Sequence, residues 1–99
     1  MTQVNLILDK IKAMLMEYGF EKVNVINPYR TTENFVHGNL YCIPQYIEHL
    51  GFLIEYASSC EEAKNHGHED GEVFPLAMGE IVILEGLKKE IEQNMDLLS

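Results

Sequence analysis

Apolar residues in the first eighteen positions recur three and four residues apart, which is the spacing of one side of an α-helix. They are Val4, Ile7, Leu8, Ile11, Met14, Leu15 and Tyr18. Thr2 is a residue type that caps helix N-termini, and Gly19 stands where a left-handed residue closes a helix. The pattern predicts a helix over residues 2–18 that packs one face against a core.

The pattern then changes to one that is typical of β-strands. A first strand is predicted over residues 20–26, because Val23 and Val25 alternate with the polar Lys22 and Asn24. Residues 29–34 are mostly polar and are expected to form an exposed loop. A second strand is expected over residues 35–43, with a turn or bulge at Gly38-Asn39.

Residues 44–50 fit two arrangements. Pro44 suits the first position of a short helix, but the same segment also suits an irregular hairpin connection. Because proline cannot donate to a strand ladder, Pro44 argues against a central strand that continues through it. Residues 52–57 predict a third strand, in which Tyr56 is expected to face Tyr41 of the neighbouring strand.

Two further helices are expected in the last third of the chain. Ser59 and Glu62 have the spacing of a capping box, which starts a short helix that runs to about His66. Residues 73–76 are mostly apolar and are expected to pack under the sheet or to form a short edge strand. A long helix is expected from about Gly79 to Leu97. Its buried stripe consists of Leu84, Leu87, Ile91, Met95 and Leu98.

This order of elements predicts a single compact α+β domain over residues 1–99. Consecutive strands with short connections favour antiparallel pairing. We therefore expect a small antiparallel sheet of three to four strands, packed on one face by the N-terminal and C-terminal helices. The chain is too short for a second core, and 46% hydrophobic residues are enough for one.

Charge and composition exclude several classes of function. The formal net charge is −9, and the chain has one arginine, Arg30, so clustered contacts with nucleic-acid phosphates or an anionic membrane are not expected. No apolar run reaches the length needed to span a bilayer, and the first residues lack the basic start of a signal peptide. Two cysteines are too few for a disulfide scaffold. Together these features predict a cytoplasmic protein with reduced thiols.

Negative charge is concentrated in the second half of the chain. Residues 51–99 hold eleven acidic and three basic side chains, which speeds encounter with a basic partner. The same charge could serve solubility alone. Tyr29 and Arg30 lie in the expected exposed loop and are residue types that anchor interfaces. The candidate partner-binding residues are Tyr29, Arg30, Glu61, Glu62, Glu69, Asp70 and Glu72.

Candidates for catalysis or metal binding are weaker. His66, His68 and the carboxylates through Glu72 could hold a divalent cation, but a glycine turn is a poor frame for these ligands. Cys60 falls in the first turn of the expected short helix, where the helix dipole favours a thiolate, yet nothing places a base beside it. Cys42 is expected in the core. We therefore expect no cofactor, no metal and no catalytic residue.

Four short phrases stand out within residues 36–92. They are Glu55-Tyr56-Ala57, Glu61-Glu62-Ala63, Glu69-Asp70-Gly71 and Phe74-Pro75-Leu76. In these phrases, and in its size, acidity and order of elements, the chain resembles small acidic immunity proteins of bacterial toxin systems. The resemblance implies a non-enzymatic inhibitor that covers the active or docking surface of a toxin, and it transfers no residue roles.

Three hypotheses follow from the sequence. The first is an acidic module that binds and neutralises a basic, toxin-like protein by occlusion. The second is a small metal-dependent or thiol enzyme that uses the cluster from His66 to Glu72. The third is an accessory or regulatory domain that forms a homodimer or larger homo-oligomer by pairing an open sheet edge with a second copy.

Overall fold

The structure is a computed structural model that describes residues 2–26, 28–29, 31–64 and 72–98. It has an N-terminal helix, four consecutive strands, a short helix, a 3-10 turn and a long C-terminal helix. These are α1 (Thr2–Glu17), β1 (Glu21–Ile26), β2 (Thr31–His37), β3 (Leu40–Ile47), β4 (Gly51–Ala57), α2 (Cys60–Lys64), η1 (Leu76–Met78) and α3 (Glu80–Leu98). The predicted α+β class is confirmed, with four strands in the sheet.

Helix α1 ends as the sequence predicts. Gly19 has a φ of 90°, which favours glycine, and its N–H donates to the carbonyl of Met16 over 3.0 Å. The N–H of Phe20 donates to the carbonyl of Leu15 over 3.2 Å. This pair of bonds is a Schellman motif, which satisfies carbonyls that the helix itself leaves free. Phe20 is then buried, so the turn directs the chain from α1 into the sheet.

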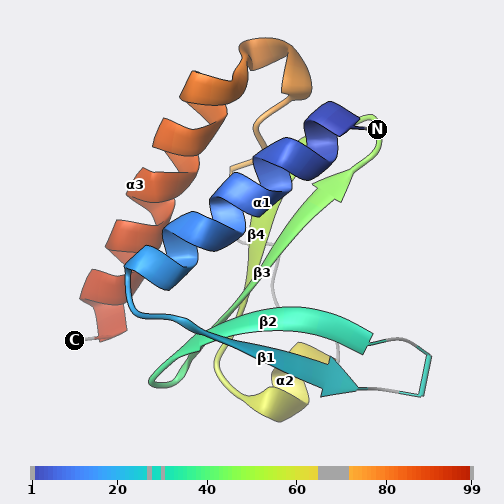
Figure 1. Cartoon of the computed structure of the whole chain (residues 1–99). Coiled ribbons are helices and arrows are strands. Elements are labelled where there is room, and N and C mark those ends of the chain that lie inside the picture. Colours follow the sequence, from blue (N-terminus) through green and yellow to red (C-terminus); the bar gives the residue numbers. More distant parts are fainter. Residues whose placement is uncertain (1, 27, 30, 65–71, 99) are drawn as a thin grey trace.

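The sheet consists of two hairpins that share a short ladder. Strand order is β1-β2-β3-β4, and all neighbours are antiparallel. Strand β2 pairs with β3 between Phe35 and His37, whereas residues 31–34 pair with β1 alone. Residues 43–47 of β3 pair with β4 alone. The two hairpins therefore diverge beyond their shared ladder (Figure 1).

Two expectations about this region are wrong. Residues 31–34 belong to β2 instead of an exposed loop, because pairing with β1 gives these polar residues backbone partners. Residues 40–47 form one strand that passes through Pro44, so residues 44–50 are neither a short helix nor a wholly irregular connection. Strand β2 no longer pairs with β3 at Pro44, so the missing N–H costs no bond on that side. The expected turn at Gly38-Asn39 is confirmed and separates two strands.

Helices cover both faces of the sheet. Helices α1 and α3 lie side by side on one face, as predicted (Figure 1). Apolar residues of α1, α3 and the strands form the main core between them, including the fully buried Ile11, Phe35 and Leu87. Helix α2 packs on the opposite face, where Ala63 joins Ile43 in a smaller cluster. A sheet with both faces covered explains why every residue of β4 is buried.

Phe74 connects the outer edge of β4 to helix α3. The N–H of Phe52 donates to the carbonyl of Phe74 and the N–H of Phe74 donates to the carbonyl of Phe52, each over 2.9 Å. The Phe74 ring packs on α3 at Gly86, where a Cβ would lie 2.3 Å from the ring. The expected short edge strand is thus a single bridge at Phe74. We call these three residues and their contacts the Phe74 clasp.

Candidate functional site

A pocket of about 820 Å³ lies beside the Phe74 clasp, on the side of α3 that faces away from α1. Helical spacing places four polar residues of α3 on this side. The pocket is lined by Glu72, Phe74, Gly86, Lys89, Glu90, Gln93 and Asn94. We call it the α3 pocket. It combines an apolar wall from Phe74 with carboxyl and amide groups.

Glu90 is the central polar group of the α3 pocket. Its Oε1 accepts a hydrogen bond from the N–H of Glu72 over 3.1 Å. Asn94 Nδ2 donates to the backbone carbonyl of Glu90 over 2.9 Å. Glu90 Oε2 is buried and has no hydrogen-bond partner among the described residues. Since a buried acceptor without a donor is costly, this oxygen lowers the stability of the folded chain.

The surroundings of Glu90 make its charge unfavourable. Burial raises the pKa of the carboxyl group above its usual range, and the negative charge of Glu72 adds to the rise. The N–H of Glu72 acts in the opposite direction because it donates to the ionised form. Glu90 therefore retains a proton more readily in the folded chain than in the unfolded chain.

Two protonated groups lie behind Glu90. Tyr56 is 8% exposed, and its hydroxyl lies beside Asn94 without a hydrogen bond of normal geometry among the described residues. Burial, and then the charge of Glu90, raise the pKa of this hydroxyl. The same two causes raise the pKa of Cys42 to about 12. Burial thus disfavours the thiolate of Cys42, which is the nucleophilic form of a cysteine.

Substitution Glu90→Gln should raise the free energy of unfolding at pH 7 by about 0.5–1 kcal/mol, after allowance for solvent that reaches half of the side chain. A raised folded-state pKa means that wild type loses stability as pH rises from about 4.5 through the folded-state value. The advantage of the variant should therefore be present at neutral pH and absent below pH 4. Urea denaturation at several pH values measures it, with the exposed Glu85→Gln as a control for charge. If Glu90→Gln were more stable than wild type by the same amount at pH 4 and pH 7, the raised pKa of Glu90 would not be the cause.

The structure places the predicted partner-binding residues in separate regions. Tyr29 is 94% exposed in the connection between β1 and β2. Glu61 is exposed on α2, and Glu72 lines the α3 pocket. Arg30, Glu69 and Asp70 lie outside the described residues. Among the described candidates, the structure brings Glu72 together with Glu90, a residue that the sequence analysis did not select.

Glu62 forms hydrogen bonds that hold the start of helix α2. Its N–H donates to Ser59 Oγ over 3.1 Å, which confirms half of the predicted capping box. Its Oε2 accepts bonds from the N–H and hydroxyl of Ser58 at 2.7 and 2.5 Å, one residue earlier than expected. The carboxylate therefore stabilises the helix start.

The pocket residues Glu90 and Asn94, and Tyr56 near them, were missed because each belongs to a pattern with another explanation. Glu90 immediately precedes Ile91 of the buried stripe, where a glutamate is usually a flanking surface residue. The expected facing of Tyr41 and Tyr56 is wrong, because Tyr56 opposes Cys42 and Tyr41 opposes Ala57. Tyr56 thus points toward α3. The sequence did contain one signal for this pocket, because Glu90 lies one helical turn after Gly86. That spacing alone does not show that the Phe74 ring fills the space above Gly86.

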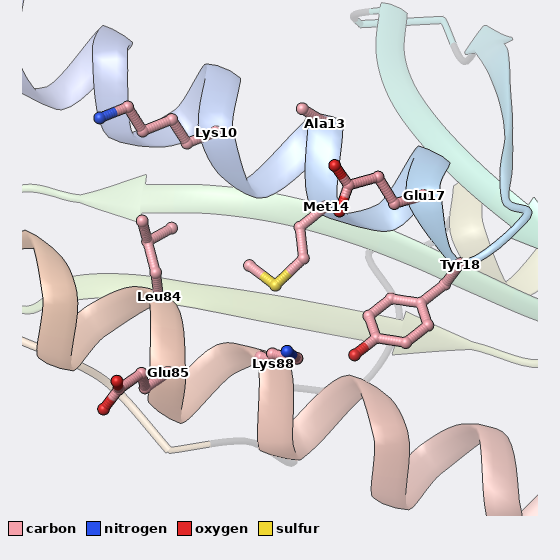
Figure 2. A pocket seen from close by; sticks show the side chains of 8 residues that line it. All are labelled: Lys10, Ala13, Met14, Glu17, Tyr18, Leu84, Glu85 and Lys88. Atoms are coloured by element: carbon pink, nitrogen blue, oxygen red, sulfur yellow. The ribbon is translucent and has the colours of Figure 1, made fainter.

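A second concave surface runs between α1 and α3 (Figure 2). It has a volume of about 600 Å³, with Met14 and Leu84 pointing into it. Lys10 forms an ion pair with Glu80 across the two helices. Lysines and glutamates both line this groove, so its charge favours no single class of partner.

Near the other end of this groove, the hydroxyl of Tyr18 donates to the carboxylate of Glu92. That hydrogen bond is the largest cause that raises the pKa of Tyr18 to about 12. The two helices are thus joined by polar contacts at two separate levels.

Glu33 shows how a satisfied carboxylate differs from Glu90. It lines a pocket of about 280 Å³ between the diverging hairpins, together with Pro44 of β3. Lys12 lies 3.1 Å and Lys22 lies 3.7 Å from its carboxylate oxygens. The bond with Lys12 is the largest cause that lowers the pKa of Glu33. Two lysines thus pair with Glu33, whereas Glu90 forms no ion pair among the described residues.

The histidine-rich candidate for metal binding lies mostly outside the described residues, which include Glu72 but not residues 66–71. Within the described ranges, no group of three or more His, Cys, Asp or Glu side chains could hold a metal ion. Cys42 is buried and Cys60 exposed, and both are free. No helix in the described part of the chain is long and apolar enough to cross a membrane.

Comparison with known proteins adds no relative. No family model, no curated protein and no solved structure matches this chain. The resemblance to immunity proteins therefore rests on the size, acidity, element order and four short phrases of the sequence, and the α3 pocket has to be interpreted from its own chemistry.

Proposed function

We propose that this chain is a non-enzymatic protein-binding module that covers a basic partner, in the way that an immunity protein neutralises a toxin. The observation that carries the proposal is a set of carboxylates in the second half of the chain that form no ion pair within the described residues. They are Glu61, Glu72, Glu85, Glu90 and Glu92.

The lysines of the first half form ion pairs, whereas the carboxylates named above do not. The ion pairs between described residues take their cations from Lys10, Lys12 and Lys22, all in the first half. Carboxylates that form no ion pair project a negative field, which steers a basic protein toward the surface. Occlusion then requires a preformed surface, which the α3 helix and the Phe74 clasp supply.

The proposal predicts a salt-dependent association rate. We would identify the partner by affinity capture from the source organism and measure association of the purified pair by stopped flow. The association rate constant should fall about tenfold or more between about 0.02 M and about 0.5 M salt, while dissociation changes less. A partner that is not basic, or an association rate that ignores salt, would overturn the proposal.

Two matched variants distinguish the effect of where the negative charge lies from the effect of the total net charge. Four second-half carboxylates are neutralised in the first variant, and four exposed first-half carboxylates in the control. The first carries Glu61→Gln, Glu72→Gln, Glu85→Gln and Glu92→Gln; the control carries Asp9→Asn, Glu17→Gln, Glu21→Gln and Glu48→Gln. The first should slow association at low salt several-fold more than the control. Equal slowing would show that net charge alone acts. Sizing of the free protein tests the competing homodimer.

A further inference from the structure

The groove between α1 and α3 has an apolar centre. Met14 and Leu84 point into it from the two helices (Figure 2). Ala13, which precedes Met14 in the sequence, adds a third apolar side chain to the lining. The centre of the groove therefore offers apolar surface that a partner can cover.

Two exposed apolar residues extend this surface along the helices. Leu6 is 55% exposed and stands one helical turn before Lys10, which lines the groove from α1. Ile81 is 72% exposed and stands one turn before Glu85, which lines the groove from α3. Helical spacing thus places both residues on the groove side of their helices, near the end where α1 and α3 begin. We call the groove together with Leu6 and Ile81 the α1-α3 face.

Helices α1 and α3 run in the same direction across this face (Figure 1). Lys10 pairs with Glu80 at the start of α3, and Tyr18 at the end of α1 donates to Glu92 farther along α3. Residues early in α1 therefore lie level with residues early in α3.

Charges of the same sign lie on the diagonals of the α1-α3 face. Along α1, the positive Lys10 precedes the negative Glu17. Along α3 the order is reversed, because the negative Glu85 precedes the positive Lys88 (Figure 2). These two lysines and two glutamates leave the lining without net charge, although the whole chain carries −9. The mixture of signs favours neither an acidic nor a basic partner, but it lets a second copy approach with little repulsion at the contact.

We propose that a second copy of this chain docks on the α1-α3 face, related to the first by a two-fold axis that runs along the groove. In such a symmetric contact, each residue meets the residue at the same level on the other helix of the second copy. Lys10 then faces the second copy's Glu85. In the same way Glu17 faces the second copy's Lys88, so every pair joins opposite charges.

The same symmetry joins the apolar residues. Leu6 faces the second copy's Ile81 at the end where the helices begin, and Met14 and Leu84 of both copies meet at the centre. An axis across the groove would also pair opposite charges. It would, however, place Leu6 and Ile81 against the end that carries Tyr18, so the apolar residues favour the axis along the groove.

This interface goes beyond the proposed function and leaves most of the acidic surface free. Among the carboxylates assigned above to the basic partner, Glu85 lines the groove and Glu92 lies at its end. Glu61, Glu72 and Glu90 lie outside it, on α2 and in the α3 pocket. The interface also differs from pairing at a sheet edge, because it uses the helices that cover the sheet.

Sedimentation equilibrium of the full chain at about 0.1 M salt tests the association. The contact spans about three helical turns, so we expect a dissociation constant on the order of 100 μM. The average mass should therefore rise from that of one chain toward that of two between about 10 μM and about 1 mM protein. A chain that stays monomeric over this range would overturn the proposal.

Replacing Ile81 tests the apolar part of the contact. Ile81→Gln should weaken the dimer at least about tenfold, because the symmetric contact loses an apolar residue twice. Val82→Gln is the matched control, since Val82 is 47% exposed on the same helix but does not line the groove. It should leave the dissociation constant within about twofold. A dimer that Ile81→Gln leaves unchanged, as a sheet-edge dimer would be, contradicts the proposal.

Reversed charges test the symmetry. Lys88→Glu should weaken the dimer at least about fivefold, whereas Lys89→Glu makes the same change on the α3 pocket side and should have an effect below about twofold. Adding Glu17→Lys to Lys88→Glu restores opposite charges across the interface, so the double variant should return to within about twofold of wild type. All three positions are exposed, and circular dichroism establishes that the variants are folded. Equal effects of the two lysine variants, or a double variant as weak as Lys88→Glu, would overturn the proposal.

Discussion

Replacing Gly86 with alanine should destabilise the protein by about 1–3 kcal/mol, although alanine is the better helix former. A Cβ at this position would lie 2.3 Å from Cε1 and 2.4 Å from Cζ of Phe74. Contacts this short force the ring or the helix to move. Phe74 is held at its backbone by two hydrogen bonds to Phe52, so the ring cannot withdraw freely.

A double-mutant cycle tests this explanation. In a Phe74→Ala background the crowding ring is absent, so Gly86→Ala should become stabilising by about 0.5–1 kcal/mol, which is the helix propensity of alanine. Urea denaturation of the four proteins gives the coupling energy. The same cost of Gly86→Ala in both backgrounds would show that the Phe74 ring is not its cause.

Gly51→Ala should destabilise the fold by about 3–5 kcal/mol and lower Tm by about 15 °C or more. Gly51 has a φ of 140°, which L-residues rarely adopt. A Cβ would also lie 2.4 Å from the carbonyl oxygen of Phe74 and 2.8 Å from Cα of Pro75. Both neighbours are backbone atoms, so the clash can be relieved only if residues 74–75 move away from β4.

Gly38→Asn is the matched control for Gly51→Ala, and thermal unfolding compares the two. Gly38 also has a positive φ, of 59°, but nothing lies within 4 Å of a Cβ there. Asparagine tolerates this conformation, so the expected cost is below about 1 kcal/mol. A similar Tm for both variants would show that the approach of Phe74 to Gly51 does not limit stability.

Patterns with local causes were predictable from the sequence. The helical repeat of α1 and its end at Gly19 depend on residues within a few turns of one another. In α3 the predicted stripe includes the buried Leu87 and Ile91, but Leu84 and Met95 are only partly buried and the fully buried Ile83 was not selected. The α+β class followed because these elements leave few ways to bury their apolar faces. The helix cap at Ser59 was also predictable because it depends on neighbouring residues, although the carboxylate of Glu62 accepts its hydrogen bonds from Ser58 instead of Ser59.

Features that depend on distant pairing were not predictable. Residues 31–34 look like a loop until β1 lies beside them, and Pro44 looks like a strand terminator until β2 diverges from β3. The α3 pocket requires Glu72, the Phe74 clasp and Glu90 to meet across the fold. The charge of the second half was evident from the sequence, whereas the burial of Glu90 Oε2 without a donor among the described residues could be found only from the packing.

The divergence of the two hairpins has a mechanical consequence. Within the sheet, the ladder between β2 and β3 joins the hairpins, and it has three residue pairs. Such a short seam of paired residues offers little resistance to a twist of one hairpin relative to the other. Helix α1 contacts both of these strands and also α3, so it acts as a brace that fixes the angle between the hairpins. The tip that carries Tyr29 and the wall that carries Glu90 lie on different sides of that seam. The residues of α1 that face the sheet therefore determine how far the tip with Tyr29 lies from the wall with Glu90, although α1 forms neither surface.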